Sequence, residues 1–345
     1  MQPSDETAWQ TLAPLIDLVT PMAVRVAATL GVADLLRDGP VSATDLARRS
    51  GADADALERM LRHLTFRGMF VESTPGVFAL NPAAALLDSE HPSGMRVSLD
   101  LTGFGGQMDL AFTRLMHTVR TGEPAWQEVF GAPFWEYLEA TPTMAASFDA
   151  VMAAGAEYVD DDAAAWDWSR ARHVVDVGGG TGALVAALLQ RHPQLQATLV
   201  DLPETVQRGR ELLVARGLER RVRIAGQSFF DPLPPAGDVY VLNSILHDWP
   251  DSDAVAILRR CAEAAGPGGV VVIIEQNDGS GADHAEMDLR MLVLCAGRER
   301  TRAEFEALAR EAGLSVTGYR STPLGQVGIE LRVAAAIDDR LPAPH

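Results

Sequence analysis

Residues 174–182 read VVDVGGGTG, an apolar run that ends in an acid and is followed by a cluster of glycines. Together with Ala183, Gly178 and Gly180 fit the pattern G-x-G-x-x-[GA] after a strand. Asp201 ends the next apolar run, where an acid can bind ribose hydroxyls. The stretch therefore predicts a nucleotide-like ligand. It is either a dinucleotide, whose pyrophosphate needs the glycines, or a nucleoside without phosphate.

Three features separate these two ligands. Asp176 lies two residues before the first glycine, where its charge is unfavourable beside a pyrophosphate but helps to order a loop that receives a cationic amino-acid tail. The packed glycines allow very close approach of the backbone. The strand–helix pattern begins near residue 172, and no second nucleotide-binding half follows it. These features favour the nucleoside.

The C-terminal half predicts an α/β fold. From Arg172 onward, short β-rich runs alternate with helical stretches at 183–191, 204–216 and 252–264. The runs are HVVDVGG, ATLVDLP, VRIAGQS, DVYVLNS and GGVVVIIEQ. Their continuous apolar character is typical of a parallel sheet covered on both faces. Residues 314–335 predict two further strands that form an antiparallel edge.

The first hundred residues predict helices followed by a small β-ribbon. An amphipathic helical pattern runs through the N-terminal segment, and Pro21 is expected to kink or break it. Ser42 predicts the N-cap of one short helix, and Asp53 or Asp55 begins another that runs to Gly68. Two strands, MFVES and GVFAL, follow. This is the winged-helix pattern, which serves either DNA binding or dimerisation.

Composition narrows the range of partners. The chain has 345 residues, 47% hydrophobic and 22% charged, and a formal net charge of −18 at pH 7. Such an acidic surface repels phosphate backbones and anionic lipid, so we expect neither a nucleic-acid nor a membrane partner. The start, MQPSDETAWQ, lacks the pattern of a signal peptide, and no apolar run approaches a membrane span. The two cysteines have no metal-ligand spacing. A cytoplasmic protein without a metal is expected.

Longer stretches of the chain carry a family resemblance. It resembles the S-adenosylmethionine-dependent small-molecule O-methyltransferases of the plant caffeate type, and specifically their bacterial relatives from aromatic polyketide and antibiotic pathways. The matching stretches, in family order, are TPMAVRVAATLGVADLL, TGEPAWQEVFGAPFWEYL, VVDVGGGTG, SFFDPLP, SILHDWPD, GPGGVVVIIE and MDLRML with GRERT.

The resemblance implies an α/β fold with a C-terminal Rossmann-like class I methyltransferase sheet and an N-terminal, mostly helical winged-helix dimerisation domain. Residues 1–100 would form the dimerisation domain, and 101–168 a helical linker that contributes substrate-pocket walls. Residues 169–345 would form the catalytic domain that binds S-adenosylmethionine.

The resemblance also implies which residues hold S-adenosylmethionine, whose product is S-adenosylhomocysteine. The loop at Gly178 and Gly180 would line the methionine end, beside Asp176, and Asp201 would bind the ribose. The other residues implied at this site are Leu202, Ser228, Phe229 and Asn243. Leu202 would flank the adenine and Phe229 would pack on it. The family often has Asp in place of Ser228, and plant relatives often have Lys in place of Asn243.

His247, in SILHDWPD, is the expected general base. A phenol with a pKa of about 10 needs a base before its oxygen can accept a methyl group. His247 follows the DVYVLNS run at its carboxyl end, where open α/β sheets bind ligands. The resemblance implies that Glu275 and Glu299 are the flanking acids that support this base.

Two neighbouring acids have alternative roles. Glu299 could pair with Arg298 or Arg300 at the surface instead of supporting His247. Asp248 is expected to cap the helix at 252–264.

The acceptor implied is a phenolic hydroxyl on an aromatic, polyketide-like natural product. Residues 101–168 are dense in aromatic and methionine side chains, which suit the walls around a flat apolar ligand. The expected walls are His117, Trp126, Phe134, Trp135, Phe148, Met152, Met291 and Cys295.

A homodimer is expected through the N-terminal helices. Residues 12–36 are too apolar to be covered by the small winged helix alone, and Ala23, Ala27 and Ala28 offer a close-packing face. Relatives use this region for an intertwined two-fold dimer.

Two alternative functions of the protein remain. Some relatives use the cofactor without methyl transfer, for hydroxylation, decarboxylation or pericyclic steps. A winged-helix DNA-binding regulator is the more distant one.

Overall fold

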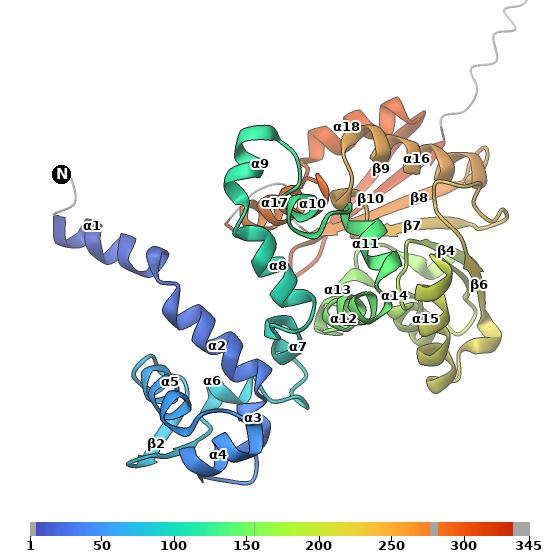
Figure 1. Cartoon of the computed structure of the whole chain (residues 1–345). Helices are drawn as coiled ribbons and strands as arrows, with labels where there is room; N and C mark the ends of the chain where they lie inside the picture. Colours follow the sequence, from blue (N-terminus) through green and yellow to red (C-terminus); the bar gives the residue numbers. More distant parts are fainter. Residues whose placement is uncertain (1–4, 155, 277–281, 334–345) are drawn as a thin grey trace, which may run out of the picture. The chain divides into compact units, whose positions relative to one another are not determined.

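The structure is a computed structural model that describes residues 5–154, 156–276 and 282–333. The chain divides into two compact units (Figure 1). The first comprises residues 1–110 and 142–155, and the second residues 111–141 and 156–345. Helix α8, Phe104–Phe112, crosses the boundary between them.

The N-terminal unit contains the predicted winged helix. Its elements are α1 (Asp5–Leu12), a 3-10 turn (Ala13–Ile16), α2 (Val19–Thr29), α3 (Val32–Leu35), β1 (Val41–Ser42), α4 (Ala43–Ser50), α5 (Ala54–Phe66), β2 (Val71–Thr74), β3 (Val77–Ala79), α6 (Pro82–Ala85), α7 (Met95–Leu99) and α12 (Pro142–Ala153). Strands pair antiparallel in the order β1-β3-β2. The Ser42 hydroxyl accepts the Asp45 N–H, and the Asp53 carboxylate accepts the Ala56 N–H. These two caps confirm the predicted starts of α4 and α5.

Two expectations about the N-terminal helices are wrong. Pro21 does not break a helix, because it lies in the first turn of α2, where its missing N–H costs nothing. The break falls earlier, between Leu12 and Val19. Ala27 and Ala28 are fully buried in the core of their own unit, so they are not a free face for a partner.

The segment from Thr7 to Thr29 is, within the described part of the chain, the one stretch long and apolar enough to cross a membrane, with a mean hydropathy of 1.4. This differs from the expectation that no run approaches a span. The stretch is interrupted by the 3-10 turn and by Asp17, whose carboxylate accepts the Val19 N–H. A single segment of this kind is weak evidence for a membrane.

The C-terminal unit is an α/β domain. Its helices are α9 (Leu115–Thr121), α10 (Ala125–Phe130), α11 (Phe134–Ala140), α13 (Ala156–Asp162), α14 (Ala183–Arg191), α15 (Pro203–Ala215), α16 (Asp251–Ala265), α17 (Ala282–Cys295) and α18 (Arg302–Glu311), with 3-10 turns at Trp168–Arg170, Glu219–Arg221 and Leu246–Asp248. Its strands are β4 (His173–Val177), β5 (Gln196–Asp201), β6 (Val222–Gly226), β7 (Val239–Asn243), β8 (Val270–Gln276), β9 (Leu314–Ser321) and β10 (Gln326–Val333).

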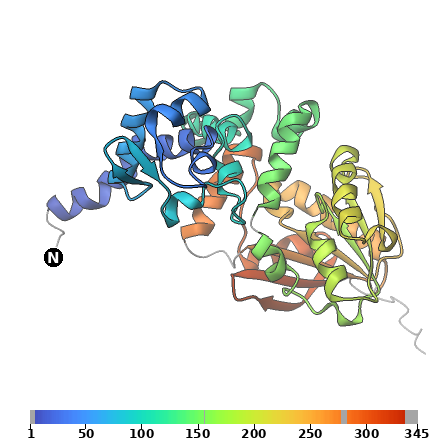
Figure 2. The same ribbon diagram turned by 90° about the horizontal axis from the view of Figure 1, so that it is seen from below.

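The sheet of this unit has the order β6-β5-β4-β7-β8-β10-β9. The first five strands are parallel, and β10 pairs antiparallel with both β8 and β9, as the sequence predicts. One core forms where α16 and α18 cover one face, and a second forms where α13, α14 and α15 cover the other (Figure 1, and Figure 2 from below). Because both faces are covered, the parallel strands are apolar at nearly every position.

The order of the strands reverses between β4 and β7. Consecutive strands run outward from β4 through β5 to β6 on one side, and from β7 to β8 on the other. In open α/β sheets, ligands bind at the carboxyl ends of the strands at such a switch point. The glycine loop follows β4 and His247 follows β7, so the fold places both predicted functional segments there.

Candidate active site

The glycine loop packs directly on the turn that carries His247. Gly178 has a φ of 77°, and a Cβ at this position would lie 2.5 Å from Ile245 Cδ1 and 3.3 Å from a ring carbon of Phe229. A side chain here would therefore be strained and would clash. The absence of a side chain at Gly178 brings the loop, Phe229 and the His247 turn together.

Asp201 fixes the loop from the end of β5. Its Oδ2 accepts the Gly180 N–H at 2.9 Å, and its Oδ1 accepts the Leu202 N–H at 2.7 Å. Ser228 follows β6, and its hydroxyl accepts the Phe230 N–H at 3.2 Å. The expected ribose and adenine residues thus follow neighbouring strands at one edge of the sheet.

A group of buried acceptors lies near the carboxyl ends of β4, β7 and α13. Both carboxylate oxygens of Asp176, Oδ1 of Asp162 and Oδ1 of Asn243 are buried and accept no hydrogen bond from the residues that the structure describes. Asn243 Nδ2 donates to Asp162 Oδ2 at 3.2 Å, which joins α13 to the end of β7. Buried acceptors are normally paired, so this group suits a ligand that brings N–H donors.

The pKa values of the acids in this group are raised. Burial, with the charges of Asp201 and Asp162, raises the pKa of Asp176 to about 7. Burial also raises the pKa of Asp162 to about 6, despite its hydrogen bond to Asn243. A cation placed among these carboxylates would stabilise their ionised forms.

His247 is held by carboxylates on both ring nitrogens. Its Nδ1 lies 2.9 Å from Glu299 Oε1 and 3.5 Å from Glu275 Oε2, and its Nε2 lies 3.5 Å from Asp248 Oδ1. Glu275 ends β8, and its Oε1 accepts the Leu246 N–H at 2.9 Å. The structure thus brings together the three residues expected to be catalytic. Glu299 is buried against His247, and its neighbours Arg298 and Arg300 pair with other acids.

The carboxylates give this imidazole an unusual proton affinity. Burial lowers the pKa of His247, but the charges of Glu275 and Asp248 and the hydrogen bond to Glu299 outweigh it and raise the pKa to about 10. Burial raises the pKa of Glu275 to about 7 and that of Asp248 to about 6, and the charge of His247 opposes both shifts. The carboxylates therefore favour the imidazolium, and the neutral imidazole that can accept a proton becomes more abundant as the pH rises.

Asp248 does not cap the following helix as expected. Helix α16 begins at Asp251, and its N-cap is Pro250, which makes no side-chain cap. Pro250 takes the cap position because the chain extends through Trp249 before the helix starts. Asp248 faces His247 instead, as a third acid that the sequence had assigned elsewhere.

Arg300 and Gly297 lock the loop that carries Glu299 onto the His247 turn. The buried guanidinium of Arg300 donates to the carbonyls of Leu246 at 2.6 Å and Trp249 at 2.7 Å. The Arg298 N–H donates to the His247 carbonyl at 2.8 Å. A Cβ on Gly297 would lie 2.1 Å from that carbonyl oxygen, so glycine is required for this close approach.

Six of the eight side chains expected to line the pocket of the methyl-accepting substrate belong to the C-terminal unit. Trp126 packs on Phe134 with ring centroids 4.9 Å apart, and Trp135 stacks on Trp249, two residues after His247, at 5.9 Å. The other three, His117 on α9 and Met291 and Cys295 on α17, are partly or fully buried.

The other two side chains expected to line the acceptor pocket, Phe148 and Met152, lie on α12 in the N-terminal unit. Phe148 packs edge-on against Phe104 of the same unit, with ring centroids 5.0 Å apart.

Asp162 is a site residue that sequence reasoning missed. It ends the acidic run Asp160–Asp162, which has the composition of a solvated surface. Its burial depends on how α13 packs against α14 and β10, and no sequence motif indicates that packing. The proximity of Asp248 to the base could have been predicted, because it directly follows His247 in the sequence.

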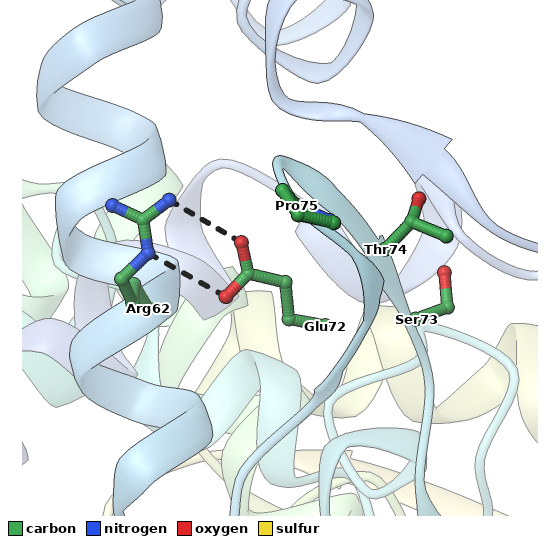
Figure 3. A pocket seen from close by; sticks show the side chains of 5 residues that line it. All are labelled: Arg62, Glu72, Ser73, Thr74 and Pro75. Atoms are coloured by element: carbon green, nitrogen blue, oxygen red, sulfur yellow. Dashed lines mark hydrogen bonds and ion pairs between the residues drawn. The ribbon is translucent and has the colours of Figure 1, made fainter.

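In the N-terminal unit, an arginine beside the β-ribbon is paired with acids. A surface hollow at the wing is lined by Arg62, Glu72, Ser73, Thr74 and Pro75 (Figure 3). Arg62 pairs with Glu58 at 2.5 Å and with Glu72 at 3.3 Å. Because the cation of α5 at this hollow is already paired with two acids, little positive charge is left for a phosphate.

Comparison with known proteins identifies the family. The O-methyltransferase domain matches residues 112–315, and the O-methyltransferase dimerisation domain matches residues 15–89. The chain is 46% identical to the 2,7-dihydroxy-5-methyl-1-naphthoate 7-O-methyltransferase of Streptomyces carzinostaticus, over 92% of this chain and 96% of that protein. It is 42% identical to the aclacinomycin 10-hydroxylase of Streptomyces purpurascens, over 93% and 88%.

A solved structure supports the same assignment. The O-methyltransferase of neocarzinostatin biosynthesis, in complex with S-adenosylmethionine and 2-hydroxy-5-methyl naphthoic acid, superimposes with a TM-score of 0.86 at 44% identity, covering 93% of this chain and 98% of that one. Together, the two domain matches and these relatives establish that the chain belongs to the S-adenosylmethionine-dependent O-methyltransferase family.

Proposed function

We propose that the protein transfers the methyl group of S-adenosylmethionine to a phenolic hydroxyl of an aromatic, polyketide-like natural product, with His247 as the general base. The observation that carries the proposal is the enclosed imidazole held by Glu299 at 2.9 Å, at the switch point of the sheet. Relatives named for naphthoate O-methylation support the aromatic acceptor. Stacked indoles beside the base, Trp135 and Trp249, suit a flat ring.

The residues present fit the cofactor. The acceptors of Asp176, Asp162 and Asn243 would bind the ammonium group of its methionine end, and Asp201 would bind the ribose hydroxyls. Leu202, Ser228 and Phe229 follow β5 and β6 and would surround the adenine. When bound, the cofactor supplies a methyl carbon activated by a positively charged sulfur.

The chain itself supplies alignment and a proton acceptor. His247 Nδ1 is hydrogen-bonded to Glu299 at 2.9 Å, whereas Nε2 is 3.5 Å from Asp248, so Nε2 is the nitrogen that would accept the proton of the acceptor hydroxyl. Glu275 and Asp248 steady the imidazolium that forms when the proton arrives. The aromatic walls hold the acceptor ring so that its oxygen meets the methyl carbon in line.

The acid group predicts a pH-dependent affinity for the cofactor product. Asp176 and Asp162, with pKa values raised to about 7 and about 6, must lose protons before they bind an ammonium group. We expect the Kd of S-adenosylhomocysteine to fall about 10-fold to 100-fold from pH 5.5 to pH 8, as up to two protons are lost. Calorimetry measures it.

The matched variants are Asp176→Asn and Asp162→Asn, which should flatten this dependence, and Glu286→Gln, an exposed acid of α17, which should not. A Kd that does not change with pH in the unmodified protein would contradict the assignment of these acids. Binding of NAD in place of S-adenosylhomocysteine would overturn the cofactor site altogether.

The loop that carries Glu299 gives a second prediction. In Gly297→Ala, the new methyl group meets the His247 carbonyl, so the loop must shift and move Glu299 away from the base. Small displacements of catalytic groups cost up to about 100-fold in rate, and we expect kcat to fall about 10-fold to 100-fold. Steady-state kinetics with 2,7-dihydroxy-5-methyl-1-naphthoate measure it. Gly318→Ala, whose Cβ would meet nothing closer than 3.6 Å, is the control and should keep full activity.

A cofactor-dependent hydroxylase is the second candidate, because a 42% identical relative is named as one. Mass analysis of the product separates the two reactions. Methyl transfer adds one CH2 and releases one S-adenosylhomocysteine for each product molecule, whereas hydroxylation adds one oxygen. A product heavier by one oxygen would replace the proposed reaction.

We also propose a homodimer formed through the N-terminal domain. A row of large apolar side chains on α1, the 3-10 turn and the start of α2 is exposed within its unit. They are Trp9, Leu12, Leu15, Ile16, Leu18, Val19 and Met22. A patch of this kind marks an interaction surface, and the match of residues 15–89 to a dimerisation domain supports a second copy as the partner.

A further inference from the structure

The proposed reaction releases a proton that must leave the protein. The carbon–sulfur bond breaks with its electron pair staying on sulfur, a carbon–oxygen bond forms, and the hydroxyl proton moves to His247. One proton therefore has to reach water in each turnover. The side chains of His247 and Glu299 are only 15% and 4% exposed. The base and its carboxylate partner are enclosed, so the proton needs a route.

A second histidine lies behind Glu299. His284, on α17, has its Nδ1 3.9 Å from Glu299 Oε2, whereas Glu299 Oε1 faces His247. The two oxygens of one carboxylate thus face two imidazoles. His284 Nδ1 is buried and has no hydrogen-bond partner among the described residues. A small rotation of either side chain closes the distance to a hydrogen bond.

The backbone holds this arrangement in place. The Glu299 N–H donates to Asp288 Oδ1 at 2.9 Å, and Asp288 lies one turn after His284 on α17. The loop that carries Glu299 is therefore fastened to the helix that carries His284.

His284 also borders a surface hollow of about 530 Å³. Glu299 lies in the same wall, together with the charged residues Asp251, Asp288, Arg298 and Glu304. All of these belong to the C-terminal unit. Four carboxylates against one guanidinium make the hollow favourable for a departing proton.

We propose that His284 takes the reaction's proton from Glu299 and releases it to water in this hollow. His284 thus acts on the base through Glu299, as a positioning and proton-exit residue rather than as the base itself. The inference rests on the proposed function, because methyl transfer is what generates the proton.

The test measures proton exit without turnover. In full-length protein labelled with ¹⁵N-histidine, the exchange of the His247 ring N–H with water is measured with S-adenosylhomocysteine bound. His284→Asn keeps a polar group in the place of Nδ1 but cannot carry a proton. We expect it to slow this exchange by about 100-fold, the lower end of the usual contribution of a proton-transfer group. His284→Gln is the second variant, and His192→Asn, at the end of α14, is the control that should change nothing.

Kinetics with 2,7-dihydroxy-5-methyl-1-naphthoate give the second measurement. We expect His284→Asn to lower kcat with unchanged KM, and added imidazole to restore it. Unchanged exchange with intact methylation would overturn the role of His284 and leave the proposed function standing. Slowed exchange without methylation would support the proton route and overturn the function. A raised KM with unchanged exchange would assign His284 to acceptor binding and overturn the proposal.

Discussion

Replacement of His247 with alanine is expected to lower kcat by about 10²–10⁴, the usual contribution of a general base. Without the imidazole, the proposed base is lost from the end of β7, and near neutral pH a phenol remains protonated. Alignment by the aromatic walls would survive, so a residual rate should remain. The measurement is kcat with 2,7-dihydroxy-5-methyl-1-naphthoate near pH 7.

Two controls isolate the base from the fold. Calorimetry of S-adenosylhomocysteine should give nearly the same Kd in His247→Ala, because the cofactor residues do not include His247. In Glu299→Gln, the loss of a carboxylate at 2.9 Å should lower the pKa of His247, so the rise of activity with pH should move to lower pH. Full turnover by His247→Ala near neutral pH would disprove the base.

The second large effect concerns assembly. In the double variant Leu15→Glu and Leu18→Glu, we expect the dimer to dissociate. These side chains are 77% and 71% exposed within the N-terminal unit. Burial of one such leucine at an interface contributes about 1.5–3 kcal/mol, so loss of both in each subunit should weaken the dimer by more than about 10³-fold. Light scattering across a dilution series measures it.

Point variants test this better than deletion of residues 1–36. Ala27, Ala28, Val32, Ala33 and Leu36 are buried in the core of the N-terminal unit, so a deletion would also remove part of that core. Val214→Glu, which changes an exposed apolar residue of α15 in the other unit, is the matched control and should remain dimeric. If the unmodified chain is a fully active monomer, the proposed interface does not exist.

Much of the fold was predictable because its signals are local. Continuous apolar runs between helical stretches predict covered parallel strands, and Ser42 and Asp53 predict helix starts by side-chain capping. The errors come from tertiary packing. Pro21 fits the first turn of a helix as readily as it breaks one, and the alanines of α2 are small enough for either a core or an interface.

The candidate site likewise contains some residues that the sequence predicts and others that it does not. His247, Glu275 and Asp201 follow strands, and the sheet gathers the ends of its strands at one edge, so sequence order predicts their proximity. Asp162 and His284 lie on helices whose packing angle no local pattern specifies. Their burial is visible only in the three-dimensional structure. There, Oδ1 of Asp162 and Nδ1 of His284 are buried near the predicted residues.

The central claim is that His247 accepts a proton from the hydroxyl that is methylated. A crystal structure with S-adenosylhomocysteine and 2,7-dihydroxy-5-methyl-1-naphthoate bound tests it most directly. The account predicts an acceptor hydroxyl within about 2.6–3.2 Å of His247 Nε2, with its oxygen facing the sulfur of the cofactor product and Glu299 still on Nδ1. An acceptor whose hydroxyls all point away from His247 would contradict it.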